Sequence, residues 1–232
     1  MTKARLVIFR HGETEYNKQG LMTGQRDIPL TETGENQARA AGILLQGIHF
    51  HKVYSSTLSR AFNTAALALQ SSKKQKHLLN KDGTWQIEQR AEIIELHTGE
   101  FTGRSHKTDP EIVKWPRIYD MPLPGGGESD EQVVARVRKF FDSEIKPRLD
   151  RGENVLIVAH SGTLHAFAIV LGVEEAPGPG RRMVTKSVPN AAPTVYTYED
   201  GKLKSASFLA NPKAPGNQNT PPAKPQRHWP KF

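Results

Sequence analysis

The segment Val155-Leu-Ile-Val-Ala159 is apolar at every position, and it constrains the fold more than any other stretch of the chain. A strand with one face in water alternates apolar and polar residues, whereas an unbroken apolar run is typical of a central strand with helices on both faces. Near the start of the chain, Arg5-Leu-Val-Ile-Phe9 has the same character. Two such strands predict an α/β fold in which helices cover a sheet.

Strand and helix patterns alternate along much of the remaining chain. Thr31 is the predicted N-cap of a helix. A long amphipathic helix is predicted from Ser129 to Leu149, bent or ended near Pro147. The other predicted elements are strands at 53–55, 194–198 and 203–209, the last two joined in a hairpin by Asp200-Gly201, and helices at 59–69 and 163–171. We therefore predict a three-layer α/β/α sandwich with a mostly parallel central sheet, while residues 73–124 show no clear pattern.

A chain of 232 residues, of which 36% are hydrophobic, can bury one substantial core. The composition changes after residue 210, where prolines and basic residues are frequent and acidic residues do not occur. We predict one domain over residues 1–210 and a Pro-rich basic C-terminal tail over residues 211–232. No apolar stretch approaches the roughly 20 residues of a membrane helix, so we expect a soluble, cytoplasmic protein. The absence of cysteine excludes disulfides, a thiolate nucleophile and Cys-based zinc sites.

The formal net charge of +8 raises nucleic acid as a partner, because basic surfaces attract polyanions. Much of the excess charge lies after Asp200, and a second cluster is formed by Lys73, Lys74 and Lys76. Neither region has the interleaved aromatic residues of a groove for single-stranded nucleic acid. A cationic face that attracts a small anionic substrate explains the charge equally well. We expect such a substrate and no nucleic-acid or membrane partner, with a homo-oligomer left open.

Two histidines follow the two apolar strands, His11 after the first and His160 after the second. Ligands in α/β folds bind outside the carboxyl ends of the strands. Arg10 lies at the end of the first strand, and Arg60 begins the helix that follows the strand at 53–55. A buried arginine is costly unless it pairs with an anion. The sequence therefore predicts two histidines and two arginines at one edge of the sheet.

An imidazole can accept a phosphoryl group when one ring nitrogen is free and a carbonyl or carboxylate holds the other. Cationic neighbours neutralise the charge on the equatorial oxygens of the transition state. Each of the four residues alone is more often structural, but four at one edge favour phosphoryl transfer to His11. The proton partner of the reacting hydroxyl would be one of three carboxyl groups, those of Glu13, Glu95 and Glu100.

The segment Arg10-His11-Gly12-Glu13-Thr14 resembles the signature of the histidine phosphatase superfamily, in the branch that includes cofactor-dependent phosphoglycerate mutases and related phosphomonoesterases. Further matches run along most of the chain: Asn17, Thr23-Gly24, Asp27, Pro29-Leu30-Thr31, Gly34, residues 55–60, Thr64, Glu95-Leu-His-Thr-Gly99, Gly103, Gly127-Glu128-Ser129, residues 155–160 and Val188-Pro189-Asn190-Ala191. The resemblance implies a phosphoglycerate-mutase-like fold, in which the domain predicted over residues 1–210 is the catalytic domain.

The resemblance also implies a role for each matching residue. The implied catalytic residues are His11, which would become phosphohistidine, Glu95 as general acid and base, and Arg10, Arg60 and His160 around the phosphoryl group. The implied substrate-binding residues are Thr14, Asn17, Thr23, Gly24, Ser161, Arg104, Lys107 and Arg117. The family uses no metal.

Three departures bear on whether the phosphohistidine returns its phosphoryl group to a sugar acid or to water. A Gly-Leu-Asn-Lys segment of the mutases reads Gly103-Arg104-Ser105-His106 here, with Lys107 one place later. An Arg-Arg pair reads Pro116-Arg117, and a His-Gly-Asn segment reads His160-Ser161-Gly162. The remaining matches favour the mutase branch, as does the tail, because such tails cover the active site in mutases and exclude water.

We therefore expect a phosphoglycerate mutase that is primed by 2,3-bisphosphoglycerate and interconverts 3- and 2-phosphoglycerate. The alternative is a histidine phosphatase that hydrolyses a small phosphomonoester such as a sugar phosphate or bisphosphate. Side chains of Arg104, Lys107 and Arg117 that point away from the pocket would favour the phosphatase. A third interpretation is a non-catalytic binding module on the same fold, which the intact set of catalytic residues disfavours.

Overall fold

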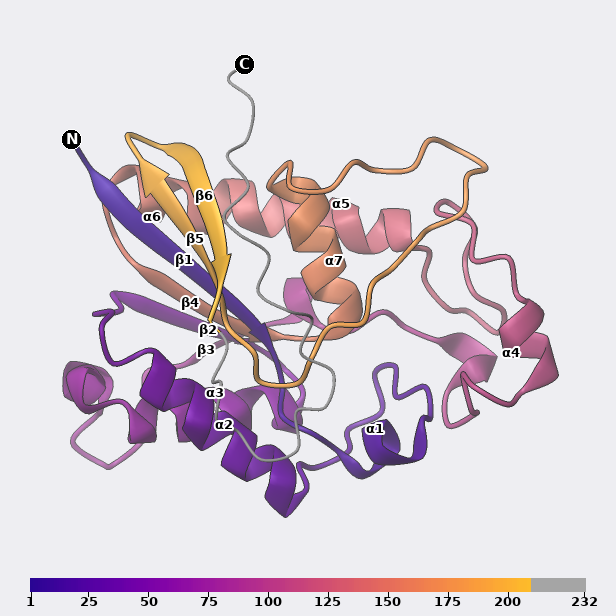
Figure 1. Ribbon diagram of the computed structural model, residues 1–232, viewed down its shortest axis with the longest axis horizontal. Coiled ribbons are helices and arrows are strands. Elements are labelled where there is room, and N and C mark those ends of the chain that lie inside the picture. Colours follow the sequence, from indigo (N-terminus) through magenta and orange to yellow (C-terminus); the bar gives the residue numbers. More distant parts are fainter. Residues whose placement is uncertain (210–232) are drawn as a thin grey trace.

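A six-stranded sheet forms the middle layer of the protein (Figure 1). The computed structural model describes residues 1–209. The strands are β1 (Lys3–Arg10), β2 (Lys52–Ser56), β3 (Glu88–Arg90), β4 (Val155–Ala159), β5 (Thr194–Glu199) and β6 (Lys202–Phe208). Their order is β3-β2-β4-β1-β5-β6, in which the first four are parallel and β5 and β6 run antiparallel to their neighbours. The predicted mostly parallel sheet is confirmed.

Helices cover both faces of this sheet. One face carries α2 (Glu32–Leu44) and α3 (Ser59–Ser71), and the other carries α5 (Asp130–Phe140), α6 (Lys146–Asp150) and α7 (Ser161–Val170) (Figure 1). The hydroxyl of Thr31 accepts a hydrogen bond from the backbone of Gly34 at 3.0 Å, so the predicted N-cap of α2 is confirmed. The three-layer α/β/α sandwich expected from the sequence is the fold of this protein.

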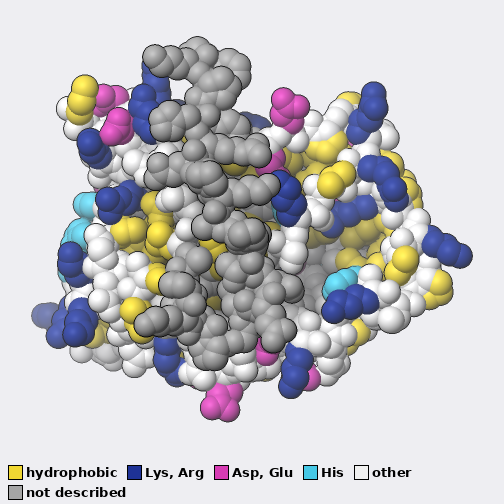
Figure 2. Space-filling model, viewed as in Figure 1, with side chains coloured by type: hydrophobic (Ala, Val, Ile, Leu, Met, Phe, Trp, Pro, Cys, Tyr) yellow, Lys and Arg dark blue, Asp and Glu magenta, His cyan; other side chains and the backbone are white. Residues whose placement is uncertain are grey.

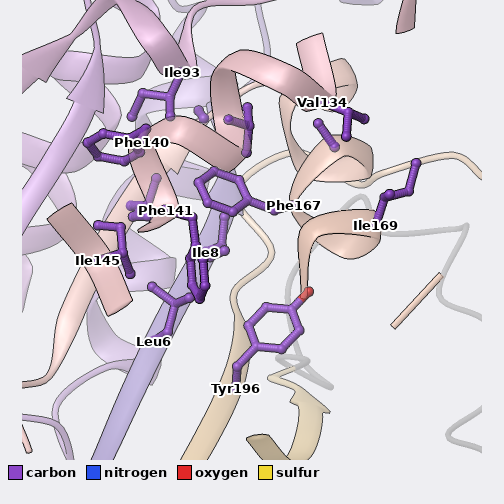
Figure 3. Packing of buried hydrophobic residues seen from close by; sticks show 14 of the residues in the cluster. Leu6, Ile8, Ile93, Val134, Phe140, Phe141, Ile145, Phe167, Ile169 and Tyr196 are labelled. Atoms are coloured by element: carbon purple, nitrogen blue, oxygen red, sulfur yellow. The ribbon is translucent and has the colours of Figure 1, made fainter. Parts of the chain in front are cut away.

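The unbroken apolar run in β1 reflects two cores, one on each face of the sheet. Leu6 and Ile8 pack with Phe167 of α7 in the core beneath α5 and α7 (Figure 3). Val7 and Phe9, the alternate residues, belong to the core beneath α2 and α3. All four strand residues are at most 1% exposed. Because side chains alternate across a strand, both sets must be apolar when both faces are covered.

Shorter elements occupy the region for which the sequence shows no clear pattern. Within this region, α4 (Pro110–Lys114) lies beyond the edge where β1 and β4 end, as does α1 (Glu15–Gln19) from an earlier part of the chain (Figure 1). Three 3₁₀ turns cover Lys73–Leu78, Ala91–Ile93 and Gly99–Phe101. Elements this short carry no readable periodicity, because two turns of a helix are needed to define an apolar face.

The predicted helix over 129–149 is interrupted, and its break precedes Pro147. After α5 the chain forms a π-helical turn at Phe141–Ile145, in which the backbone N–H of Lys146 bonds to the carbonyl of Phe141, and α6 then follows. Proline has no N–H, and in a regular α-helix its ring would clash with the carbonyl of Ser143. A wider turn before Pro147 relieves this clash, and the helical stretch continues through Pro147 to Asp150.

The hairpin between β5 and β6 confirms the prediction from Asp200-Gly201. Asp200 has φ 47° and Gly201 has φ 71°, the left-handed conformations that a tight type I′ turn requires.

The strand register brings the carboxyl ends of β1, β2 and β4 to one edge, because Arg10 pairs with Ala159 and Ser55 pairs with Val158. Side chains that follow these strands are therefore neighbours.

The predicted tail over 211–232, its suggested covering of the active site and the domain boundary at residue 210 lie outside the described residues. Among residues 1–209, no helix has both the length and the apolar character needed to cross a membrane.

Candidate active site

His11 lies directly after β1, and its ring is held by the chain itself. Its backbone N–H bonds to the carbonyl of Ala159 at 3.0 Å, and its Nδ1 lies 2.6 Å from the carbonyl oxygen of Gly12. A carbonyl oxygen can only accept, so Nδ1 carries the hydrogen and Nε2 keeps a free lone pair. Burial, together with the charges of Arg10 and Arg60, lowers the pKa of His11 well below its ordinary value. The imidazole is therefore neutral and nucleophilic at neutral pH.

Arg10 and Arg60 place two buried cations beside His11. Arg10 donates from Nη1 to the carbonyl of Val188 at 2.9 Å. Arg60 is 0% exposed and donates to the carbonyls of Arg26 and Gly24 at 2.7 and 2.8 Å. Burial lowers the pKa of Arg10 and lowers that of Arg60 to about 10, so both stay charged at neutral pH.

Neither arginine forms an ion pair with a carboxylate in the described part of the chain, and the Nε atom of each is buried without a partner there. A desolvated guanidinium with unused donors fits an anion with several oxygens. The observation supports a phosphoryl group bound between Arg10, Arg60 and Nε2 of His11.

His160 lies against His11, with 5.2 Å between the ring centroids. It is the N-cap residue of α7, and its Nε2 lies 2.7 Å from Oγ of Ser56 at the end of β2. Burial lowers its pKa well below the ordinary value, and the charges of Arg60, His11 and Arg10 lower it further. Its Nδ1 is buried, and no group within residues 1–209 bonds to it. A ligand oxygen beside His11 would supply that partner.

Glu95 is the only carboxyl-bearing residue among the described residues that line the cavity beside His11. One carboxylate oxygen, Oε1, accepts from the backbone N–H groups of Leu96 and Gly162 at 2.9 and 3.0 Å. The other oxygen, Oε2, takes no hydrogen bond from residues 1–209, which leaves it for a ligand hydroxyl. Of the two other carboxyl candidates, Glu13 bonds to the hydroxyl of Thr31 at 2.9 Å and Glu100 is exposed, and neither lines the cavity.

The cavity has a volume of about 570 Å³ and opens on the side of the molecule where β1 and β4 end. Figure 2 shows Lys and Arg side chains around the hollow in the right half of this face. Ten residues expected from the sequence line it: Arg10, His11, Asn17, Thr23, Gly24, Arg60, Glu95, Lys107, Arg117 and Ser161. The structure therefore brings together most of the predicted site.

Three of the expected residues lie elsewhere. His160 is 0% exposed beside His11 and is not among the residues that line the cavity. Thr14 is 0% exposed and caps α1, where its hydroxyl accepts from the backbone of Asn17 at 3.3 Å. Arg104 is bonded to both carboxylate oxygens of Asp109 at 2.9 Å and to Glu111 at 2.7 Å. The guanidinium of Arg104 is thus engaged with two carboxylates outside the cavity.

The segment before Asn190 forms a wall of the cavity that sequence reasoning missed. Thr185, Lys186 and Ser187 line it, together with His106 and His165. Arg117, which has φ 40° and holds Asp130 through two hydrogen bonds of 2.8 and 3.0 Å, reaches the hydroxyl of Thr185 at 3.3 Å. In this part of the chain, only Val188-Pro189-Asn190-Ala191 resembles the family. The one sequence signal that could have placed Lys186 in the site is its position two residues before this segment.

No group of three or more His, Asp or Glu residues within residues 1–209 has the arrangement of a metal site. The groups present suit a phosphate ester instead: a neutral nucleophilic imidazole, two buried guanidinium groups and one carboxyl. Such a set can transfer a phosphoryl group through phosphohistidine, with charge neutralisation by arginine and proton exchange by Glu95. The fold and the site define an enzyme of the phosphoryl-transfer class.

Comparisons with known proteins agree with this class. The family model of the histidine phosphatase superfamily (branch 1) matches residues 6–210. The chain belongs to the histidine phosphatase superfamily, as the sequence predicted, and it is an enzyme of the mutase and phosphatase type.

The relatives include both kinds of enzyme. A protein of Methylobacterium sp. (strain 4-46) named 2,3-bisphosphoglycerate-dependent phosphoglycerate mutase is 39% identical, over 88% of this chain and 96% of its own length. A phosphoglycerate mutase from Bacillus anthracis str. Sterne is similar in structure, with a TM-score of 0.70, 26% identity and coverage of 90% of this chain and 93% of its own. A mycobacterial glucosyl-3-phosphoglycerate phosphatase gives a TM-score of 0.63 and 29% identity, covering 83% and 92% of the two chains.

Proposed function

We propose that this protein is a 2,3-bisphosphoglycerate-dependent phosphoglycerate mutase, which interconverts 3- and 2-phosphoglycerate in the cytoplasm. The observation that carries the proposal is a second group of cations in the cavity that holds His11. Lys107 and Lys186 line this cavity in addition to Arg10 and Arg60, and so does Arg117, whose Nε and Nη2 bond to Asp130. A monophosphate needs only the first pair, whereas the carboxylate or second phosphate of a phosphoglycerate needs another cationic surface. The relatives named as mutases support the same substrate.

In the proposed reaction, Nε2 of His11 attacks phosphorus while the bond between phosphorus and the ester oxygen breaks. The carboxyl group of Glu95 gives its proton to that oxygen, and Arg10 and Arg60 neutralise the transferring phosphoryl group. In the return step, the carboxylate of Glu95 takes the proton of the attacking hydroxyl as phosphorus leaves Nε2. The hydrogen bond from Nδ1 of His11 to Gly12 holds the ring in position through both steps.

The bisphosphate would be held by the same residues, because a molecule with an anionic group at each end matches two sets of cations. Arg10 and Arg60, with their buried unpartnered Nε atoms, would hold one phosphate, and Lys107, Arg117 and Lys186 would face the other. When bound, 2,3-bisphosphoglycerate supplies the phosphoryl group that primes His11.

The test uses the purified full-length chain with 3-phosphoglycerate, with and without 2,3-bisphosphoglycerate, and follows both 2-phosphoglycerate and inorganic phosphate. We expect isomer formation that the bisphosphate stimulates, with little phosphate release, and no reaction above background in His11→Ala. Rapid phosphate release without bisphosphate-stimulated isomer formation would rule out the mutase.

A phosphatase that acts on a phosphorylated sugar or sugar acid is the second candidate, and the position of Arg104 favours it. The bonds of Arg104 to Asp109 and Glu111 remove one expected cation from the cavity. The similarity to a mycobacterial phosphatase, whose printed name is glucosyl-3-phosphoglycerate phosphatase, points the same way. The phosphate measured in the assay above separates this candidate from the mutase.

A further inference from the structure

The backbone that carries Glu95 has no helix or strand of its own to position it. Glu95 lies between the 3₁₀ turns Ala91–Ile93 and Gly99–Phe101. Its carboxyl group is fixed at one oxygen by Leu96 and Gly162. These bonds set where Oε1 lies only if the main chain on either side is itself held, because a loop without ladder hydrogen bonds is otherwise free to shift.

Arg136, in the middle of α5, holds this backbone from one side. Its Nη1 donates to the carbonyl of Glu92 at 2.7 Å, and its Nη2 donates to the carbonyl of Glu95 itself at 3.2 Å. The planar guanidinium thus joins two carbonyls that lie three residues apart in the chain. A buried helix supplies the rigid support, because Val133, Val134 and Val137 of α5 are at most 6% exposed.

Glu128, just before α5, completes the arrangement. Its Oε1 lies 3.0 Å from Nε of Arg136, and its Oε2 lies 3.2 Å from Nη2 of the same residue. Oε2 also accepts from the backbone N–H of His97 at 2.9 Å, and the N–H of Glu128 donates to the carbonyl of His97 at 2.9 Å. The pair therefore fixes the chain before, at and after Glu95. Their side chains are 18% and 23% exposed, which protects these bonds from much of the screening that weakens surface pairs.

We propose that Arg136 and Glu128 are positioning residues that set the distance between the carboxyl group of Glu95 and the ester oxygen of the substrate. The inference rests on the proposed function of Glu95 as the acid that protonates this oxygen. Neither Arg136 nor Glu128 lines the cavity, so neither is a substrate-binding residue. Both hold the backbone around Glu95, and a shift of about 1 Å in a catalytic group can cost about 100-fold in rate.

Proton donation matters in proportion to the basicity of the leaving oxygen. When phosphorus moves from the ester to Nε2 of His11, the electron pair of the broken bond stays on the ester oxygen. p-Nitrophenolate is stable as an anion and needs no proton, whereas phenolate is more basic and gains much more from one. A displaced Glu95 therefore slows the reaction of phenyl phosphate and leaves that of p-nitrophenyl phosphate nearly unchanged.

The experiment compares kcat/KM for these two aryl phosphates in the full-length protein and in Arg136→Met, Arg136→Lys and Glu128→Gln. For Arg136→Met we expect a loss of about 10- to 100-fold with phenyl phosphate and of less than about 3-fold with p-nitrophenyl phosphate. Glu128→Gln should show the same selectivity, and Arg136→Lys a smaller loss, because lysine can keep one of the bonds. Arg138→Met, an exposed position on the same helix, is the matched control and should change neither value.

Glu95→Gln is the reference variant that tests the acid role of Glu95 separately from the positioning role of Arg136 and Glu128. If Glu95→Gln loses activity equally with both substrates, the acid role of Glu95 is wrong and the proposed function fails at that step. If Glu95→Gln is selective for phenyl phosphate but Arg136→Met and Glu128→Gln lose activity equally with both substrates, or lose none, the positioning role is wrong. Thermal unfolding checks each variant, and the nearly isosteric Glu128→Gln decides the question if Arg136→Met does not fold.

Discussion

Nδ1 of His11 lies 2.6 Å from the carbonyl oxygen of Gly12, the next residue in the chain. The backbone that places His11 at the end of β1 therefore also fixes its tautomer, and no other side chain is needed for this. The ring is 2% exposed, so little water reaches its Nε2, which faces a bound ligand or the neighbouring cations. Protonating such a ring would bring a third positive charge next to Arg10 and Arg60. The fold thus keeps His11, the proposed nucleophile, neutral, and this makes its stability depend on pH.

The free energy of unfolding should decrease as the pH falls below about 6.5, in part because of His11 and His160. Both rings are buried, and the pKa of each is lowered well below the ordinary value, so below pH 6.5 the unfolded chain binds more protons than the folded one. Their contribution is complete above pH 6.5 and is lost as the pH falls towards the folded pKa values, with a slope of up to about 1.4 kcal/mol per pH unit for each ring. Urea unfolding between pH 7.5 and pH 5 measures this slope.

His160→Gln isolates one of the two contributions, since carboxyl groups titrate alike in both proteins. The slope below pH 6.5 should be shallower in the variant than in the unaltered protein. Equal slopes in the two proteins would mean that His160 is accessible to protons in the folded state.

The layers of the fold follow from the sequence because the decisive pattern is local. An unbroken apolar run such as 155–159 specifies a strand covered on both faces, and each cap or turn residue, Thr31 and Asp200 among them, acts within a few positions of its own. The secondary structure of residues 73–124 could not be predicted, because its elements are short and are held by residues distant in the sequence. The bond between Arg136 and the carbonyl of Glu92 joins positions far apart in the chain and leaves no local signal.

The site residues that follow strands could be predicted from the sequence, whereas the positions of the side chains on loops could not. His11, Arg60 and His160 follow strands whose parallel register brings them together. Arg104 was expected in the pocket from its place in a segment, but the nearby carboxylates of Asp109 and Glu111 hold its guanidinium. Lys186 was missed because no motif covers its loop. Charged side chains on loops depend on which partner lies within reach, and that follows only from the three-dimensional structure.

The second group of cations should control the affinity for phosphoglycerate and not the chemistry at His11. In Lys107→Met and Lys186→Met we expect KM for 3-phosphoglycerate to rise about 3- to 10-fold, because each variant removes one partly screened charge from the cavity wall. KM for p-nitrophenyl phosphate, which has no carboxylate, should stay within about 2-fold. Arg181→Met removes a charge from the same loop outside the cavity and is the matched control. A similar rise for both substrates would place these lysines at the transferred phosphate instead.

Phe167 should be among the most costly residues to truncate, because it fills the core between α7 and the sheet. Its side chain is 0% exposed and packs near Ile8 of β1 (Figure 3). We expect Phe167→Ala to lower the free energy of unfolding by about 3–5 kcal/mol, through lost burial and the cavity it leaves. Ile43→Ala on α2, at a position 58% exposed, should change it by less than about 0.5 kcal/mol. Urea unfolding at pH 7.5 gives both values, and a loss below about 1 kcal/mol in Phe167→Ala would contradict the packing.

Asn190 should influence catalysis through Asn17. The amide nitrogen of Asn190 donates to the carbonyl of His11 at 2.9 Å and to Oδ1 of Asn17 at 3.2 Å. The same Oδ1 accepts from the backbone N–H of Thr14 at 3.2 Å, so two hydrogen bonds fix the amide group of Asn17, a residue that lines the cavity and whose NH₂ is free to donate to a phosphoryl oxygen. We expect Asn190→Ala to lower kcat/KM by about 10- to 100-fold, because a hydrogen bond to a charged group contributes about 1.5–3 kcal/mol and each 1.4 kcal/mol is tenfold.

A double-mutant cycle distinguishes this route from a direct effect of Asn190 on His11. If Asn190 acts by orienting Asn17, the double variant Asn17→Ala/Asn190→Ala should lose little more activity than Asn17→Ala alone, because the group being oriented is already absent. Losses that multiply would show instead that the bond to the His11 carbonyl carries the effect. Asn36→Ala on α2 removes an amide that does not line the cavity and provides the control. Since His11 and Asn17 flank the capping residue Thr14, the outcome decides whether Asn190 holds the loop after β1 as one unit or only at His11.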